Sequence, residues 1–348
     1  DGVRGLANRS PITAELAIAL GRALTRRFGS PTHRSRILIG KDTRRSCYLL
    51  ESAIAAGICS AGGDAIMLGP IPTPAVAFLV RSMRADAGVM ISASHNPFQD
   101  NGIKLFASDG YKLPDAVELA LEREILDPPG EEALPTGGDI GRVRRLDEAI
   151  GRYVVFAKTA FPAGLNLEGL RVAVDCANGA GYRVAPMALE ELGAEVVAVG
   201  VRPNGTNINE GVGSLYPDHL GEVVRKEKCH VGLCLDGDAD RLIVVDERGE
   251  TVDGDQLMAI NALAMMAEGK LARQTLVATV MSNLALDRCL EAAGGHVVRT
   301  GVGDRYVVEA MRAGGYNLGG EQSGHLIFLD HSTTGDGLVA GLGLLGAM

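Results

Sequence analysis

The chain has 348 residues, of which 46% are hydrophobic and 4% aromatic, with 46 glycines and no tryptophan. At roughly 100–150 residues per domain, this length predicts two or three domains, and the composition favours many strand-to-helix turns over an aromatic-rich β-sandwich. The net charge is −9 and no Lys/Arg-rich run occurs. These features argue against a nucleic-acid partner, although a few converging cations would still let an acidic protein bind a phosphorylated small molecule.

The cysteines and the hydrophobic runs predict the compartment. Six cysteines are present and none forms a Cys-x-x-Cys pair, so we interpret them as buried free thiols rather than disulfides or a zinc site. With no signal peptide and no long apolar span, we expect no membrane partner and a cytoplasmic location. The chain starts without a methionine and stops inside an apolar run, which we interpret as a fragment of a longer protein.

Strands and helices alternate from the first predicted element onward. Leu16, Leu20 and Leu24 recur at helical spacing, and Thr13 can cap the N-terminus, which predicts a helix over 13–27. Further predicted elements in the first part of the chain are a strand at 36–40, a helix opened by 41–44, a strand at 65–68, a helix that follows 70–74 and ends near 84, a strand at 87–91, a polar loop at 92–102 and a surface excursion at 127–142.

The alternation continues to the end of the chain. The predicted elements there are a strand at 171–175, a helix at 182–192, a strand at 195–199, strands at 231–235 and 242–246, a helix at 255–267, a strand at 275–280, a helix at 283–293, a strand at 296–299 and a helix at 304–312. This pattern predicts three consecutive three-layer α/β/α domains with mixed sheets, over 1–150, 151–248 and 249–348. The three parts are alike in rhythm, but no sequence repeat is evident.

The first constellation with chemical potential is a row of carboxylates, Asp236, Asp238 and Asp240, in a loop between two predicted strands. Oxygen-only ligands favour Mg²⁺, Ca²⁺ or Mn²⁺ over Zn²⁺, and three adjacent negative charges require a cation. A solvated polar turn is the simplest alternative. An EF-hand is rejected, because Arg241 occupies the position that must be glycine and the flanking segments are strands.

A second constellation follows the strand at 87–91. It presents Ser92, Ser94, His95 and Asn96 on a loop at the carboxyl end of the strand, where open α/β sheets place their sites. We expect adjacent Ser and His side chains to point apart on an extended loop, so a Ser–His triad is not indicated. Ser94 could instead carry a phosphoryl group, which would need a metal and cations nearby. An ordinary turn of small polar residues stays open as the alternative.

A third polar cluster lies at 319–325, where Glu321, Ser323 and His325 are suited to sugar hydroxyls or an amine. An ordinary β-turn is the alternative. Several cations also lie near turns, among them Lys41 and Arg44. We favour four of them as site residues because each lies in a loop motif that contains Gly or Asp; these are Arg4, Lys104, Arg241 and Arg305.

Taken together, four segments resemble the motifs of the α-D-phosphohexomutase superfamily, in the same order. They are 1–5 (Asp-Gly-Val-Arg-Gly), 92–104 (Ser-Ala-Ser-His-Asn-Pro, then Asp-Asn-Gly-Ile-Lys), 236–241 (Asp-Gly-Asp-Ala-Asp-Arg) and 320–325 (Gly-Glu-Gln-Ser-Gly-His). Gln322 and the run 303–305 are most similar to the branch that acts on glucosamine phosphate. The resemblance extends over nearly the whole chain.

The resemblance implies a role for each candidate residue in phosphoryl transfer. Ser94 would be the phosphorylated serine, Arg4 and Arg241 would steady phosphate charge, and His95 and Lys104 are candidates for proton transfer. One Mg²⁺ would be held by the three aspartates of 236–240 and an oxygen on Ser94. The sugar contacts implied by the resemblance are Glu321, Ser323, His325 and Arg305.

The implied reaction interconverts glucosamine 6-phosphate and glucosamine 1-phosphate through a glucosamine 1,6-bisphosphate intermediate, and it would supply cell-wall amino sugars. The implied partner is this small phosphosugar. A homodimer, formed with a second copy of the chain, stays open beside a monomer. A phosphomannomutase or phosphoglucomutase with the same mechanism, or a non-catalytic sugar-phosphate-binding paralogue, are the other hypotheses. The chain departs from the family pattern at Ala239, where Gly is common, and by lacking the family's fourth, C-terminal phosphate-binding domain.

Overall fold

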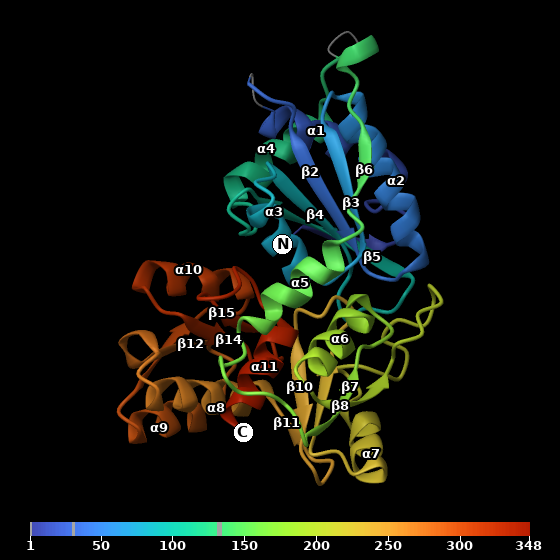
Figure 1. Cartoon of the computed structure of the whole chain (residues 1–348). Helices are drawn as coiled ribbons and strands as arrows, with labels where there is room; N and C mark the ends of the chain where they lie inside the picture. The colour runs from blue at the N-terminus through green and yellow to red at the C-terminus, as the bar shows by residue number, and fades with distance from the viewer. Residues whose placement is uncertain (1, 30–31, 131–133) are drawn as a thin grey trace. The chain divides into compact units, whose positions relative to one another are not determined.

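The computed structural model describes residues 2–29, 32–130 and 134–348 (Figure 1). The chain divides into two compact units, one of residues 1–150 with 203–208 and one of residues 151–202 with 209–348. The first unit contains one β-sheet and the second contains two. All three sheets mix parallel and antiparallel strands, which confirms the predicted fold class.

The first sheet has six strands. In spatial order they are β1 (Val3–Leu6), β5 (Asp100–Ala107), β4 (Ala87–Ile91), β2 (Arg36–Lys41), β3 (Asp64–Pro70) and β6 (Val143–Arg145). Strands β4, β2, β3 and β6 run parallel, whereas β5 is antiparallel to both of its neighbours, β4 and β1. The chain therefore reverses at the carboxyl end of β4, and the loop formed there carries Ser94.

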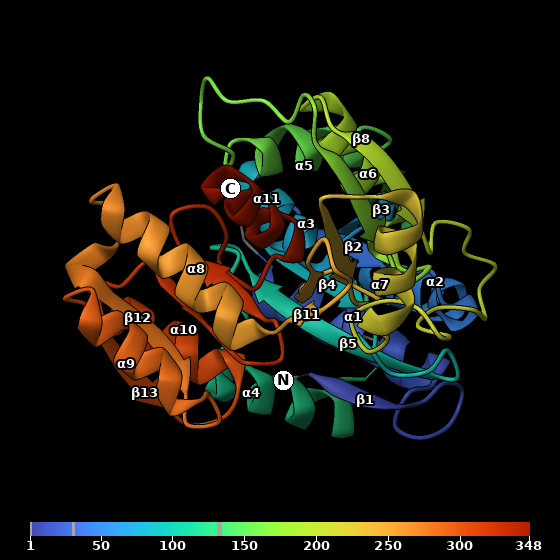
Figure 2. The ribbon, with the colours of Figure 1, turned by 90° about the horizontal axis from the view of Figure 1, so that it is seen from below.

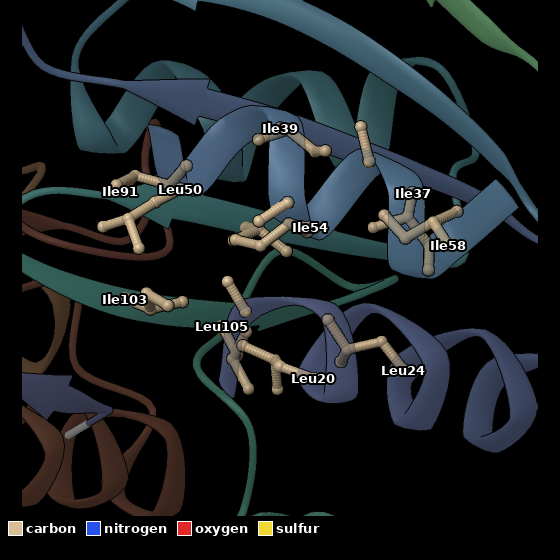
Figure 3. Packing of buried hydrophobic residues seen from close by; sticks show 14 of the residues in the cluster. Leu20, Leu24, Ile37, Ile39, Leu50, Ile54, Ile58, Ile91, Ile103 and Leu105 are labelled. Atoms are coloured by element: carbon tan, nitrogen blue, oxygen red, sulfur yellow. The ribbon is translucent and has the colours of Figure 1, made fainter. Parts of the chain in front are cut away.

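Helices cover both faces of this sheet. One face packs against α1 (Ala14–Phe28), α2 (Arg45–Ser60) and α4 (Asp115–Leu126), and α3 (Thr73–Ser82) covers the other. Figure 3 shows the core between the sheet and the first two helices, formed by Leu20, Leu24, Ile37, Ile39, Leu50, Ile54, Ile58, Ile91, Ile103 and Leu105. Full burial of each such side chain contributes about 1.5–3 kcal/mol, so this core stabilises the strands β4 and β5 that flank the serine loop.

The second sheet has five strands, in the order β11 (Thr251–Val252), β10 (Leu242–Val245), β9 (Val231–Leu235), β7 (Arg171–Asp175) and β8 (Glu195–Val199). Helix α7 (Pro217–Glu227) packs its Leu220 and Val224 on one face. Strand β8 also packs against α6 (Val184–Glu191). The last helix of the chain, α11 (Gly337–Ala347), crosses over to contact β9 and β10, which ties the second and third sheets into one unit.

The third sheet has four strands, in the order β13 (His296–Thr300), β12 (Thr275–Thr279), β14 (Leu318–Gly320) and β15 (Leu326–Phe328). Helix α10 (Asp304–Gly314) packs Val307 and Met311 on one face, and α8 (Gly254–Ala267) contacts Gly320 through Met258 on the other. Helix α9 (Leu284–Ala292) lies against α8 and β13. Figure 2 shows these helices around the strands of the third sheet.

The three sheets share one strand order. The series β5–β4–β2–β3 in the first sheet corresponds to β10–β9–β7–β8 in the second and to β15–β14–β12–β13 in the third, with the same parallel and antiparallel pairs. In each sheet, the first of these strands runs against the others. The similar rhythm seen in the sequence thus reflects a shared topology.

Several elements differ from those expected. Strand β5 begins at Asp100, so the polar loop after β4 is shorter than the predicted 92–102, because Asn101–Ile103 pair with β1. The helices α4, α5 (Ala149–Lys158) and α7 were not predicted. The strands that were not predicted are β1, β5, β6, β11, β14 and β15. Part of the predicted surface excursion, 131–133, lies outside the described residues; the rest includes a 3-10 turn at Gly137–Asp139 and is largely exposed. Within the described ranges, no helix is both long and apolar enough to cross a membrane.

A buried polar contact fixes the start of α11. The Asp336 carboxylate accepts hydrogen bonds from the Leu338 and Val339 N–H groups and, at 2.9 Å from both oxygens, from the Tyr153 hydroxyl of α5. Burial raises the pKa of Asp336 from 3.8 to about 6, against the lowering by its hydrogen bonds from Val339 and Tyr153. The packing of α11 therefore depends on a carboxyl group with an unusual proton affinity.

This pKa predicts a pH dependence of stability. The folded-state pKa of about 6 lies above the unfolded pKa of 3.8. The contribution of Asp336 to the free energy of unfolding is therefore fully present below pH 3.8 and is lost as the pH rises through 6. We expect Asp336→Asn to keep the helix cap and to remove this component, which is on the order of 3 kcal/mol. As the pH is raised from 4 to 7 in EDTA, the Tm of the wild type should therefore fall relative to the Tm of the variant.

The matched control is Asp139→Asn, which changes a carboxylate that is 87% exposed. Its Tm should follow that of the wild type at every pH. Parallel curves of Tm against pH for the wild type and Asp336→Asn would contradict the assignment.

Candidate functional site

The serine loop, which we define as residues 92–99, joins the antiparallel neighbours β4 and β5. Ser94 lies in it with a φ of +51°, a left-handed conformation that is unfavourable for a residue with a side chain. The Ser94 N–H donates to the Ser92 hydroxyl at 2.9 Å, and the Ser94 hydroxyl lies 3.4 Å from His95 Nδ1. The expectation that these neighbouring Ser and His side chains point apart is therefore wrong, because the backbone is not extended at Ser94.

Two of the predicted cations belong to the strands next to this loop. Arg4 is on β1, opposite Gly102 of β5, and Lys104 is on β5, opposite Met90. A Cβ atom on Gly102 would lie 2.9 Å from Arg4 Cγ and 2.7 Å from the Ser92 carbonyl oxygen, so only glycine lets the arginine and the serine loop approach this closely. Arg4, Lys104 and His95 therefore lie in the same unit as Ser94, and their shared role stays a prediction.

The carboxylate loop, residues 236–241, joins the antiparallel neighbours β9 and β10 in the second unit. Asp236, Asp238 and Asp240 are all buried, and one oxygen atom from each lies within 4.8 Å of the others. Ala239 has a φ of +57°, which accounts for the expectation that glycine is common at this position. Hard oxygen donors packed this closely suit a Mg²⁺-type ion, so the donor set fits the metal that the sequence predicts.

Arg241 closes the carboxylate loop and responds to its charge. Burial acts to lower the pKa of Arg241, but the carboxylates of Asp240, Asp236 and Glu321 outweigh that effect, and the pKa is raised. The Arg241 N–H also lies 3.3 Å from Asp236 Oδ1, as a donor. The guanidinium therefore stays charged beside the carboxylates and offsets part of their negative charge.

The sugar loop, residues 321–325, joins β14 and β15 and lies against the carboxylate loop within the second unit. The Leu242 N–H donates to the Gly324 carbonyl at 2.9 Å, and a Cβ atom on Gly324 would lie 2.2 Å from the Leu242 carbonyl oxygen. Glu321 Oε1 accepts from the Gly303 N–H at 3.2 Å, which brings the loop that precedes Arg305 to the same place. Ser323 is exposed and available to a ligand.

His325 is placed differently from the other residues of the sugar loop. It is only 3% exposed, and its Nε2 accepts from the Gly335 N–H at 3.1 Å. Its Nδ1 lies 3.8 Å from Asp240 Oδ1, and Nε2 lies 3.3 Å from Asp304 Oδ2. The imidazole therefore contacts a predicted metal ligand from inside the protein, whereas the sequence groups it with the sugar contacts.

Sequence reasoning overlooked the residues beneath the serine loop. Asp42 and Arg44 are fully buried, and they contact the loop through Ser92, Ser94 and Asn96. The signal that could have found them is the run 41–44 at the carboxyl end of a buried strand, where Arg44 was passed over as one of several cations near turns.

With this geometry in place, comparison with known proteins identifies the class. Family models described as phosphoglucomutase/phosphomannomutase, alpha/beta/alpha domains I, II and III match residues 1–129, 152–249 and 253–348 in turn. The chain belongs to the phosphoglucomutase/phosphomannomutase family, which confirms the resemblance to the phosphohexomutase superfamily.

Individual relatives refine this assignment. A phosphoglucosamine mutase of Syntrophotalea carbinolica is 60% identical over 349 residues, covering 100% of this chain and 76% of that protein. One of Anaeromyxobacter sp. is 59% identical over 352 residues, covering 100% of this chain and 75% of that protein. Among solved structures, a phosphoglucomutase/phosphomannomutase family protein from Burkholderia thailandensis has a TM-score of 0.84 and 26% identity, covering 100% of this chain and 76% of that one.

The carboxylate loop generates a prediction about metal binding. Replacing Asp238 by Asn removes one of three clustered ligand charges, so we expect Mg²⁺ affinity to fall by about tenfold or more in calorimetric titration. Asp246→Asn is the matched control, because Asp246 lies in the turn after β10, where its carboxylate accepts from the Arg248 and Glu250 N–H groups. Equal Mg²⁺ affinities in the two variants would refute the metal assignment.

Proposed function

We propose that the chain interconverts glucosamine 6-phosphate and glucosamine 1-phosphate, as a mutase whose phosphoryl carrier is Ser94. The observation that carries the choice of sugar is the 59–60% identity to phosphoglucosamine mutases over the full length of the chain. The residues of the serine loop, the carboxylate loop and the sugar loop are those that such a reaction needs. The glucosamine 1,6-bisphosphate intermediate, the cytoplasmic location and the homodimer stay predictions.

The first step transfers a phosphoryl group from Ser94 to the free hydroxyl of the sugar phosphate. The phosphorus–oxygen bond to Ser94 breaks as the bond to the attacking hydroxyl forms, and a bisphosphate and a free serine result. The attacking hydroxyl gives up its proton to a base, for which we propose His95 or Lys104. Reversal at the other phosphate returns a phosphoryl group to Ser94, so the enzyme ends in the state in which it began.

In phosphoryl transfer, the protein contributes mainly by positioning the reactants and by stabilising the negative charge on the transferring group. Asp236, Asp238 and Asp240, with an oxygen on Ser94, would hold a Mg²⁺ that offsets negative charge on the phosphoryl group. We propose that Arg4 and Arg241 steady phosphate oxygens. The raised pKa of Arg241 supports this role, because a guanidinium held among carboxylates remains a cation at every physiological pH.

Sugar recognition is proposed for the second unit. Glu321 and Ser323 offer an acceptor and a hydroxyl suited to the amine and hydroxyl groups of glucosamine. Arg305 is proposed as a further contact, since it follows Gly303, whose N–H donates to Glu321. The burial of His325 behind Asp240 favours a role in holding that carboxylate over a direct sugar contact. A phosphomannomutase or phosphoglucomutase activity would use the same parts with a different sugar.

The test of this proposal is turnover of the Ser94-phosphorylated full-length enzyme with Mg²⁺ on glucosamine 6-phosphate, mannose 1-phosphate and glucose 1-phosphate. We expect a preference of about a hundredfold or more in kcat/KM for glucosamine 6-phosphate, because a site built to pair an amine leaves groups unpaired with a neutral hexose. Preference for a neutral hexose would move the protein to the second function. No turnover on any of the three would favour the non-catalytic paralogue.

Ser94→Ala tests the carrier itself. We expect turnover to fall to background while the Tm stays within a few degrees, because the variant loses only the phosphoryl acceptor. The matched control is Ser52→Ala on α2, whose exposed hydroxyl donates to the Tyr48 carbonyl. A folded Ser94→Ala variant with the turnover of the control would disprove the phosphoserine assignment.

A further inference from the structure

Arg44 is the largest side chain buried completely in the described part of the chain, although a charged guanidinium is costly to bury. It lies at the N-cap of α2, directly after the strand β2. Its Nη2 donates to the Ser94 carbonyl at 3.1 Å and to the Asn96 carbonyl at 2.6 Å. One guanidinium group therefore binds the backbone on both sides of His95 and fixes the turn that presents Ser94.

Asp42 makes the burial of this cation tolerable. It is also fully buried, and its carboxylate accepts from Arg44 Nη1 and, at 2.9 Å, from the Arg44 N–H. The Ser92 hydroxyl donates to Asp42 Oδ2 at 2.6 Å and accepts from the Ser94 N–H at 2.9 Å. The ion pair thus reaches Ser94 by two routes. In the first, Arg44 binds the Ser94 carbonyl directly; in the second, Asp42 binds the Ser92 hydroxyl, which accepts from the Ser94 N–H.

Both routes end at the peptide groups of a residue with a strained backbone. The left-handed conformation of Ser94 is unfavourable for a residue with a side chain, and such strain persists only where the surroundings hold it. The same conformation brings the Ser94 hydroxyl to 3.4 Å from His95 Nδ1. The network beneath the loop therefore determines where the hydroxyl points.

We propose that Arg44, paired with Asp42, is a positioning residue for phosphoryl transfer: it holds the Ser94 backbone in its left-handed conformation and so sets the direction of the phosphorylated oxygen. This inference rests on the proposed role of Ser94 as the phosphoryl carrier. An arginine is needed because its planar fork reaches the Asp42 carboxylate with one nitrogen and two carbonyl oxygens with the other. A lysine supplies one point charge and cannot hold this pattern.

The test compares Arg44→Lys with the wild type by steady-state kinetics, calorimetric Mg²⁺ titration and a single-turnover assay of phosphate transfer from Ser94 to glucosamine 6-phosphate. We expect the single-turnover rate and kcat to fall by about a hundredfold, since a misplacement of about 1 Å costs that much. KM should change little, because the sugar loop is intact. Mg²⁺ affinity should fall less than in Asp238→Asn, because all three aspartate ligands remain and only the Ser94 oxygen is redirected.

The matched control is Glu51→Gln, which breaks the buried ion pair of Lys41 and Glu51 in the same region without touching the serine loop. It should lower the Tm, as loss of one partner of a buried pair does, and leave kcat within about twofold. If Arg44→Lys does not fold, Ser92→Ala replaces it. That variant removes only the Ser92 route, and its single-turnover rate should fall by about tenfold.

Two outcomes overturn the inference while leaving the proposed function standing. One is a folded Arg44→Lys variant that transfers phosphate at the wild-type rate, and the other is an equal loss of kcat in Arg44→Lys and Glu51→Gln, which would reveal a general effect of stability. Absence of turnover in the wild-type enzyme on every hexose phosphate tried would instead refute the proposed function.

Discussion

The burial of three carboxylates at one point is the constraint on which the rest of the site depends. Oxygens of Asp236, Asp238 and Asp240 lie within 4.8 Å of one another, and like charges at that distance repel by about 3 kcal/mol per pair at an effective dielectric constant of 20. Arg241 offsets part of this charge, and His325 packs against Asp240 from behind. A bound divalent cation would relieve the remainder, which is why we propose that this loop holds the Mg²⁺ that offsets phosphoryl charge.

The three candidate loops occupy the same position in their respective sheets. In each sheet, a parallel strand is followed by an antiparallel neighbour, and the connection between them holds candidate residues: the serine loop after β4, the carboxylate loop after β9 and the sugar loop after β14. The carboxyl ends of parallel strands are where open α/β sheets bind ligands. The same arrangement of strands therefore positions the proposed carrier, the proposed metal ligands and the proposed sugar contacts.

The sequence predicts well the elements that depend on short, local sequence patterns. The helix after Thr13 is predicted by its cap and its leucine spacing, and the strands β2, β4, β9 and β12 are predicted by continuous apolar runs. The alternating spacing of Asp236, Asp238 and Asp240 is likewise a local pattern. The parts it does not predict depend on distant contacts. In the sequence, Arg44 resembles any arginine near a turn, and only the sheet shows that it lies beneath Ser94. The assignment of His325 to the sugar contacts stays a prediction, and its contact with Asp240 is a tertiary one that no local pattern indicates. Strand β1 is too short to show alternation.

The central claim is that Ser94 carries the phosphoryl group that the enzyme moves. The most direct measurement is peptide mass spectrometry of the enzyme before and after a single turnover with isotopically labelled glucosamine 6-phosphate and Mg²⁺. We expect one phosphate on Ser94 at the start, its appearance on the sugar within one turnover, and labelled phosphate on Ser94 afterwards. Turnover at the full rate with Ser94 unmodified throughout, or with the phosphate on another residue, would contradict it.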